Sequence, residues 1–133
     1  MVESRVVLKE SIDERAKDII AIVNEFAKTY SEIITSSSET RKKQFVDLVE
    51  AASQACCVDE FKLYIKYKGA KEGTRSLWGN LANPFNARID ALIEKVADEI
   101  DKDNEDVRLE VLRRFCGYLM WRTHADIAER GGR

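Results

Sequence analysis

Histidine and cysteine, the side chains that most often perform acid–base or nucleophilic chemistry, are scarce in this chain of 133 residues. His124 is the only histidine, and Asp126, two residues further on, would not share a helix face with it. The cysteines are Cys56, Cys57 and Cys116, and an adjacent pair does not have the spacing of a zinc site. The sequence contains no phosphate-binding loop or nucleophile elbow. We therefore expect no catalytic residue, no metal site and no cofactor, with the cysteines as small apolar fillers in a reduced compartment.

The acidic run DEIDKDNED, residues 98–106, is the other arrangement that could bind a metal. Oxygen-bearing side chains alternate across Asp101, Asp103 and Glu105, as calcium ligands do. The run lacks the glycine and the terminal glutamate at the spacing that an EF-hand requires. We therefore interpret it as a helix cap within a solvated acidic turn.

Basic side chains are segregated along the chain, although the net charge is only −2. Residues 41–88 carry nine Lys or Arg against five Asp or Glu, and residues 107–133 carry six against three. Residues 89–106 carry two against eight. Because local potential steers the association of a polyanion, two basic blocks point to a nucleic-acid partner despite the acidic total.

Two clusters in the first basic block are the candidate contacts. Arg41, Lys42 and Lys43 follow an expected helix start, where the helix dipole favours acidic side chains instead. In the stretch FKLYIKYKGAKEGTR, residues 61–75, the cations Lys68, Lys71 and Arg75 are spaced three and four apart. They would share one face if the helix continued. A solvated lysine edge on an ordinary core helix is the alternative interpretation.

Aromatic side chains could add stacking to a basic surface. Candidates for stacking on unpaired bases are Tyr64, Tyr67, Trp78, Tyr118 and Trp121. Aromatic residues at helical spacing belong to a core more often, so we expect Tyr118 and Trp121 to pack with their polar tips near the surface. For the same reason we expect residues 61–67 to form a packed helix whose lysines extend into solvent.

The positions of apolar residues predict the elements that carry these side chains. Apolar residues recur at spacings of three and four over residues 12–34, which predicts one long helix, and the run TSSSET ends it. A second helix would bury one face of residues 45–56. Capping boxes are expected at the start of these two helices, formed by Ser11 with Glu14 and by Ser36 with Glu39.

Three more helices are expected to begin at Asp59, at Asn83 with Pro84 in the first turn, and at Asp103 or Asn104. Gly69 and Gly73 should end or loosen the first of these three. No stretch alternates convincingly with the period of a strand. The sequence therefore predicts an all-α, single-domain bundle of about five helices over residues 1–133.

The apolar runs and the N-terminal stretch indicate the cellular location of the protein. No run approaches the ~20 residues that span a bilayer, and the N-terminal stretch lacks the pattern of a signal peptide. We therefore expect a cytoplasmic protein without a membrane partner.

Several short motifs resemble those of a known family. They are the run TSSSETR at a helix start, a helix rich in lysine and tyrosine that ends in Gly-Ala-Lys, and the final stretch LRRFCGYLMWRTHADIAERGG. In this order they are similar to the small subunit of type III CRISPR effector complexes, in particular the Csm-type subunit, with the Cmr-type subunit as the nearest alternative. The resemblance covers roughly residues 33–132.

The resemblance implies a non-catalytic, RNA-binding structural subunit that contacts phosphates along the duplex of guide RNA and target RNA. Implied partners are those RNAs, other effector subunits including the backbone subunits, and stacked copies of the chain itself. Arg41 matches the arginine after the Thr-Ser start, and Lys71 and Arg75 lie at or just after the basic turn. Charge alone adds Lys42, Lys43, Lys68, Arg113, Arg114 and Arg122. The alternative function is a helical protein–protein adaptor without direct contact to nucleic acid.

Overall fold

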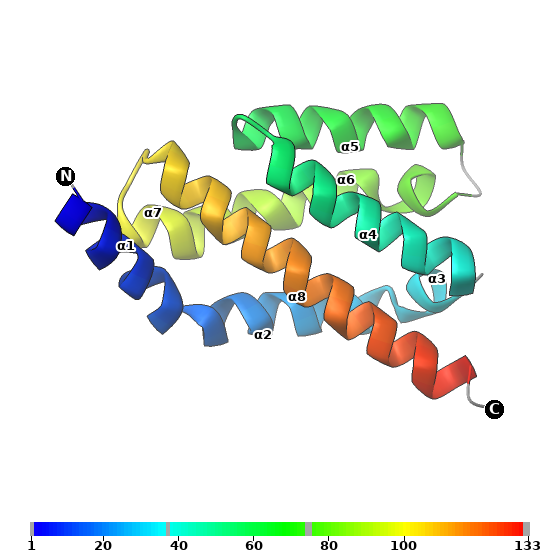
Figure 1. Cartoon of the computed structure of the whole chain (residues 1–133). Helices are drawn as coiled ribbons and strands as arrows, with labels where there is room; N and C mark the ends of the chain where they lie inside the picture. The colour runs from blue at the N-terminus through cyan, green and yellow to red at the C-terminus, as the bar shows by residue number, and fades with distance from the viewer. Residues whose placement is uncertain (1, 37, 74–75, 132–133) are drawn as a thin grey trace.

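The computed structural model describes residues 2–36, 38–73 and 76–131, and within these ranges all regular structure is helical (Figure 1). The predicted all-α class is therefore confirmed. Over the described residues, seven continuous helices take the place of the expected five, because the predicted N-terminal helix is divided into three. One cluster of buried apolar side chains extends from Ile12 to Leu119, so the helices enclose a common core.

The predicted helix over residues 12–34 is wrong in its continuity and in its start. It comprises α1 (Val2–Glu14), α2 (Ala16–Thr29) and α3 (Ser31–Thr35), with breaks at Arg15 and Tyr30. Arg15 donates hydrogen bonds to Asp18, to the carbonyl of Lys95 and to Glu99, which fasten the first break to residues 95–99. Ser11 lies inside α1 and therefore cannot cap it.

Helices α4 (Ser38–Gln54) and α5 (Val58–Glu72) follow, and neither begins as predicted. Ser36 ends α3, where its hydroxyl donates a 2.8 Å hydrogen bond to the carbonyl of Ile33, so it is not part of the expected capping box. The first residue of α5 is Val58, one before the predicted cap Asp59. Its backbone amide donates a 2.7 Å hydrogen bond to the carboxylate of Glu105, so a side chain from the last helix caps α5.

The helix predicted to begin at Asn83 and Pro84 begins earlier. It comprises α6 (Leu77–Leu92), the π-helical turn η1 (Ile93–Ala97) and α7 (Asp98–Ile100) in one continuous run. The hydroxyl of Ser76 caps it by accepting a 2.9 Å hydrogen bond from the amide of Gly79. Pro84 lies inside α6, where proline removes one backbone hydrogen bond. Burial of Leu77, Trp78, Leu81 and Ala82 before the proline offsets that loss.

The last helix, α8 (Glu105–Gly131), lies at the centre of the bundle, between α2 and α4 (Figure 1). Its predicted cap is confirmed, because the side-chain oxygen of Asn104 accepts a 3.2 Å hydrogen bond from the amide of Val107. The predicted apolar face is also buried, from Val107 to Ile127. The core centres on Phe85 of α6, whose ring lies 5.2–6.3 Å from those of Trp78, Phe26, Phe115 and Phe61.

The packing of α5 on α6 determines which side of α5 faces solvent. Gly69 lies within α5, and a Cβ atom built there would be 2.7 Å from the Cβ of Ala82 and 2.8 Å from the carbonyl oxygen of Trp78. The two helices therefore approach each other closely at this glycine. Gly73, which ends α5, has a φ of 81° that favours glycine, so the prediction that it ends the helix is confirmed.

Candidate nucleic-acid interface

Arg41, the residue that matched the family motif, is buried in the protein. Only 7% of it is exposed, and its guanidinium donates hydrogen bonds to the carbonyl of Ile33, to Gln44 and to the hydroxyl of Ser36. Burial lowers the pKa of the guanidinium, and the negative charge of Glu72 acts in the opposite direction. In this position Arg41 joins α3 to α4, and its charge is not presented to a phosphate.

The three predicted arginines of α8 also have partners within the protein. Arg113 donates hydrogen bonds to the carbonyls of residues 52, 53 and 55, at and just beyond the end of α4, where a helix leaves carbonyl groups without partners in the helix itself. Arg114 forms ion pairs with Asp13 and Glu110. Arg122 contacts Asp126 and Asn24. These arginines hold α8 against its neighbours. Their guanidinium N–H groups, which an RNA contact would need, already donate to acceptors within the protein.

The predicted lysines Lys42, Lys43 and Lys68 remain at the surface, and each has a carboxylate on its own helix. The ion pairs join Lys42 to Glu39 at 3.8 Å, Lys43 to Asp47 at 3.4 Å and Lys68 to Glu72 at 2.7 Å. The hydrogen bond from Lys68 to Glu72 raises the pKa of Lys68. Lys43 keeps 78% of its side-chain surface exposed, whereas Lys68 keeps 27%.

Residues 41–47 of α4 and residues 68–72 of α5 act on each other electrostatically. The charge of Asp47 on α4 contributes to the raised pKa of Lys68 on α5, and the charge of Glu72 on α5 acts on Arg41 of α4. The fold therefore brings the two predicted cation clusters to one region of the molecule. Arg75 belongs to the predicted set but lies outside the described residues.

The outward side of α5 carries a strip that the predicted set only partly included. We call Leu63, Lys66, Tyr67, Ala70 and Lys71 the α5 strip; all five are exposed and recur at spacings of three and four. Within the described residues, neither Lys66 nor Lys71 forms an ion pair with a carboxylate. The ammonium of Lys71 lies 5.7 Å from the centre of the Tyr67 ring. The α5 strip is thus a mixed cationic and aromatic surface.

Two predictions about aromatic side chains are wrong. Tyr67 was expected to be packed, and it is 57% exposed. Trp121 was expected to pack on α8 with only its polar tip near the surface, and it is 67% exposed, with its ring 5.8 Å from that of Tyr118. The helical periodicity of the sequence does indicate that Tyr67 and Lys66 are exposed, although the predicted set of RNA-binding residues contains neither. Val58, Phe61 and Ile65 are the buried positions of α5, and residues 66 and 67 point away from them on that helix.

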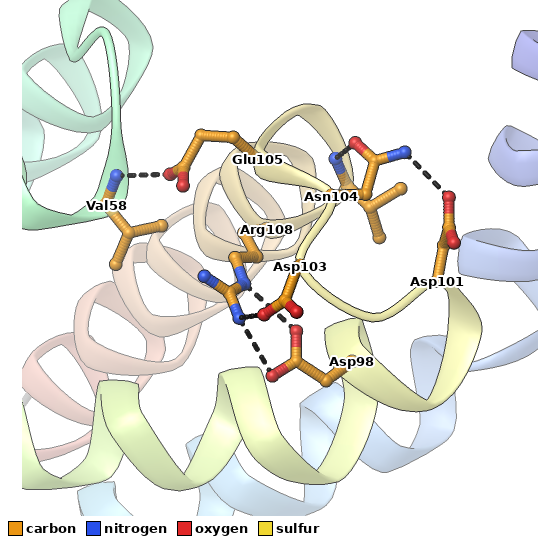
Figure 2. A network of polar contacts seen from close by, with 8 residues as sticks. Val58, Asp98, Asp101, Asp103, Asn104, Glu105 and Arg108 are labelled. Carbon is orange, nitrogen blue, oxygen red and sulfur yellow. Dashed lines mark hydrogen bonds and ion pairs between the residues drawn. The ribbon is translucent and has the colours of Figure 1, made fainter.

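The acidic run forms a polar network at the start of α8 (Figure 2). Arg108 pairs with Asp98 through two hydrogen bonds of 2.9 and 3.0 Å, and with Asp103 at 3.1 Å. The guanidinium holds the pKa of Asp98 below its ordinary value. Among the residues that the structure describes, no group of three or more His, Cys, Asp or Glu side chains could hold a metal ion.

The single histidine lies between two helices. Its ring nitrogen Nε2 is 3.3 Å from the carbonyl oxygen of Lys42, so His124 packs α8 against α4. Burial raises the pKa of the Cys116 thiol, whereas Cys56 is exposed. In the described part of the chain, no helix combines the length and the apolar character needed to cross a membrane.

In comparisons with known proteins, no family profile, no curated protein and no solved structure matches this chain.

Proposed function

We propose that this protein is a non-catalytic, RNA-binding structural subunit of a type III CRISPR ribonucleoprotein effector. It would line the duplex of guide RNA and target RNA through contacts to phosphates that do not read the sequence. The proposal rests on the family resemblance of the motifs in residues 33–132 and on the surface chemistry of α5. The observation that carries it is the α5 strip, where Lys66 and Lys71 are exposed without a carboxylate partner among the described residues.

Lysines of this kind suit the proposed role. An ammonium group on a long, flexible stem is a point charge that can follow a phosphate backbone. Guide–target pairing supplies sequence recognition in such complexes, so the protein needs only a cationic surface of suitable shape. Lys42, Lys43 and Lys68 lie at the same end of the bundle and can add to the potential, although carboxylates on their own helices partly neutralise them.

The structure also narrows the set of residues that we assign to RNA. Arg41, Arg113, Arg114 and Arg122 are engaged within the protein, so we assign them to stability of the fold. Lys66 joins the set, and Lys71 stays in it. Lys42, Lys43 and Lys68 take a secondary place because an RNA phosphate would have to compete with their carboxylate partners.

A salt titration tests this proposal. The chain should bind a mixed-sequence RNA duplex of about 20 base pairs, with an affinity that falls steeply between about 50 and 200 mM salt. The double variant Lys66→Glu, Lys71→Glu should weaken binding, and each lost phosphate contact should flatten the logarithmic salt slope by about one unit.

The matched control is Lys17→Glu on α2, another exposed lysine without a carboxylate partner among the described residues. The control reverses the charge of one exposed lysine and the double variant reverses two, so the loss of affinity is compared per reversed lysine. The control should bind RNA nearly as well as the wild-type chain. Equal losses per reversed lysine at the two places would show a response to net charge alone, and no RNA binding at low salt would overturn the proposal.

A protein–protein adaptor is the second candidate function, and Trp121 is the observation that favours it. Exposed tryptophans are enriched among the residues that dominate protein interfaces. Trp121 and Tyr118 form an aromatic pair at the surface of α8, beside arginines that already have partners. An adaptor would lose its partner in the variant Trp121→Ala and would be insensitive to Lys66→Glu, Lys71→Glu.

A further inference from the structure

Two of the most exposed large apolar side chains lie one helical turn apart on α5. Leu63 is 67% exposed and Tyr67 is 57% exposed, and both belong to the α5 strip. The buried positions of α5, Val58, Phe61 and Ile65, already hold it in the core. Neither Leu63 nor Tyr67 is therefore needed for the packing of the bundle, which leaves the ring of Tyr67 available to a ligand.

The charges around Tyr67 indicate which ligand fits. Lys66 is adjacent in sequence, and Lys71 places its ammonium 5.7 Å from the centre of the ring. A nucleotide combines a flat aromatic base with a negative phosphate, and single-stranded nucleic acids are commonly held by an aromatic ring beside cations. Within a duplex, both faces of a base are already stacked on neighbouring bases, so Tyr67 can accept only a base that is unpaired and unstacked.

We propose that Tyr67 is a stacking platform for an unpaired base of single-stranded RNA, and that Lys66 and Lys71 hold the adjoining phosphates. Leu63 extends the apolar surface on which the base rests. This inference deepens the proposed function and rests on it. It adds that the α5 strip prefers a single strand, whereas contacts to phosphates alone would accept a duplex equally well.

A comparison with Trp121, an exposed aromatic residue of α8, shows why α5 is the better platform. Trp121 has the larger ring and is more exposed, but the neighbouring arginines Arg114 and Arg122 are paired with carboxylates. A phosphate near Trp121 would have to displace Asp13, Glu110 or Asp126 from these arginines. On α5 the cations beside the ring have no such competitor among the described residues.

The first test compares affinities for a mixed-sequence RNA of about 20 nucleotides, alone and annealed to its complement. Tyr67→Leu keeps an apolar side chain but removes the ring, and it should weaken binding to the single strand about fivefold, which corresponds to about 1 kcal/mol. Tyr67→Phe keeps the ring and should bind like the wild type. Neither variant should change the affinity for the duplex, and Trp121→Ala should change neither affinity.

The second test observes stacking directly. In a chain that carries Tyr67→Trp and Trp121→Phe, the remaining native tryptophan is Trp78, which is 3% exposed. Single-stranded RNA should quench the emission of the new indole, because a stacked base lies against its ring. Quenching should saturate at the RNA concentration at which binding saturates.

The outcomes separate this inference from the proposed function. If Lys66→Glu, Lys71→Glu weakens RNA binding but Tyr67→Leu does not, the stacking platform is overturned and the phosphate contacts stand. If bound RNA leaves the emission at position 67 unchanged, the ring faces something other than a base, such as a neighbouring protein subunit, and the inference is overturned. If the chain binds neither form of RNA at low salt, both proposals fail together.

Discussion

Because α5 approaches α6 closely, we predict that replacing glycine with alanine has opposite effects on stability at two positions, Gly69 and Gly117. Gly69 and Gly117 both lie inside helices, where alanine is favoured over glycine by about 1 kcal/mol. At Gly117, a Cβ atom would meet nothing within 4 Å, so Gly117→Ala should stabilise the protein by about that amount. At Gly69, the new Cβ would be 2.7 Å from the Cβ of Ala82 and 2.8 Å from the backbone oxygen of Trp78.

These neighbours of Gly69 cannot move aside by rotating a side chain, because one is a Cβ atom and the other belongs to the backbone. The helices must therefore separate, and overpacking of this kind costs about 1–3 kcal/mol. We expect Gly69→Ala to be less stable than Gly117→Ala by about this amount, despite the same gain in helix propensity. Urea denaturation followed by circular dichroism measures the free energy of unfolding of each variant. In thermal unfolding, the midpoint temperatures of the two variants should differ by about 4 °C for each kcal/mol of difference in stability. Equal stabilisation of the two variants would refute the close contact that directs the α5 strip to solvent.

The remaining predictions concern Arg41, the network at the start of α8 and the cysteines. Arg41→Ala should lower the free energy of unfolding by about 1–3 kcal/mol, because buried hydrogen bonds are lost. If the affinity of the folded variant for RNA is unchanged, the role of Arg41 is structural. Because Arg108 lowers the folded-state pKa of Asp98, this pair contributes stability above the unfolded-state pKa, near 4, and loses it as the pH falls through the folded-state value. Asp98→Asn should therefore cost about 0.5–1 kcal/mol at neutral pH and flatten the acid limb of stability against pH; an unchanged limb would contradict the assignment. A thiol reagent at neutral pH should modify Cys56 in the native protein and Cys116 only after denaturation, because Cys116 is buried. Mass spectrometry of the labelled peptides measures this, and labelling of Cys116 in the native protein would contradict its burial.

The periodicity of apolar residues was a reliable guide to which positions are buried, because it reflects the geometry of a helix and needs no knowledge of partners. It predicted the all-α class and the buried face of α8. The acidic run predicted a cap at Asp103 or Asn104, and Asn104 is the residue that caps α8. Helix starts were less predictable when the capping group comes from elsewhere in the chain. Glu105 caps α5 across a separation of 47 residues, and no local pattern at Asp59 could reveal that contact.

The sequence could suggest a cationic region but not which of its side chains are available to a ligand. Charge segregation singled out two clusters, and the fold places those of α4 and α5 near each other; that this region binds RNA stays a prediction. Sequence alone could not show which cations have internal partners. Arg41 and Arg113 bind carbonyl oxygens, and every residue has such an oxygen, so no acidic residue in the sequence marks the contact. Lys66 and Tyr67, by contrast, could have been found by placing them opposite the buried positions Phe61 and Ile65.

Photochemical crosslinking to RNA tests the central claim most directly, because it shows which residues touch the nucleic acid. A protease that cleaves after glutamate would release residues 61–72, which contain the whole α5 strip, as one peptide, and residues 111–129, which contain Trp121, as another. We predict that the nucleotide adduct is on the first peptide, at or next to Tyr67. The variant Lys66→Gln, Lys71→Gln, which adds no cleavage site, should reduce its yield. An adduct confined to residues 111–129, or a yield no greater than that of the denatured chain, would contradict the claim that the α5 strip binds RNA.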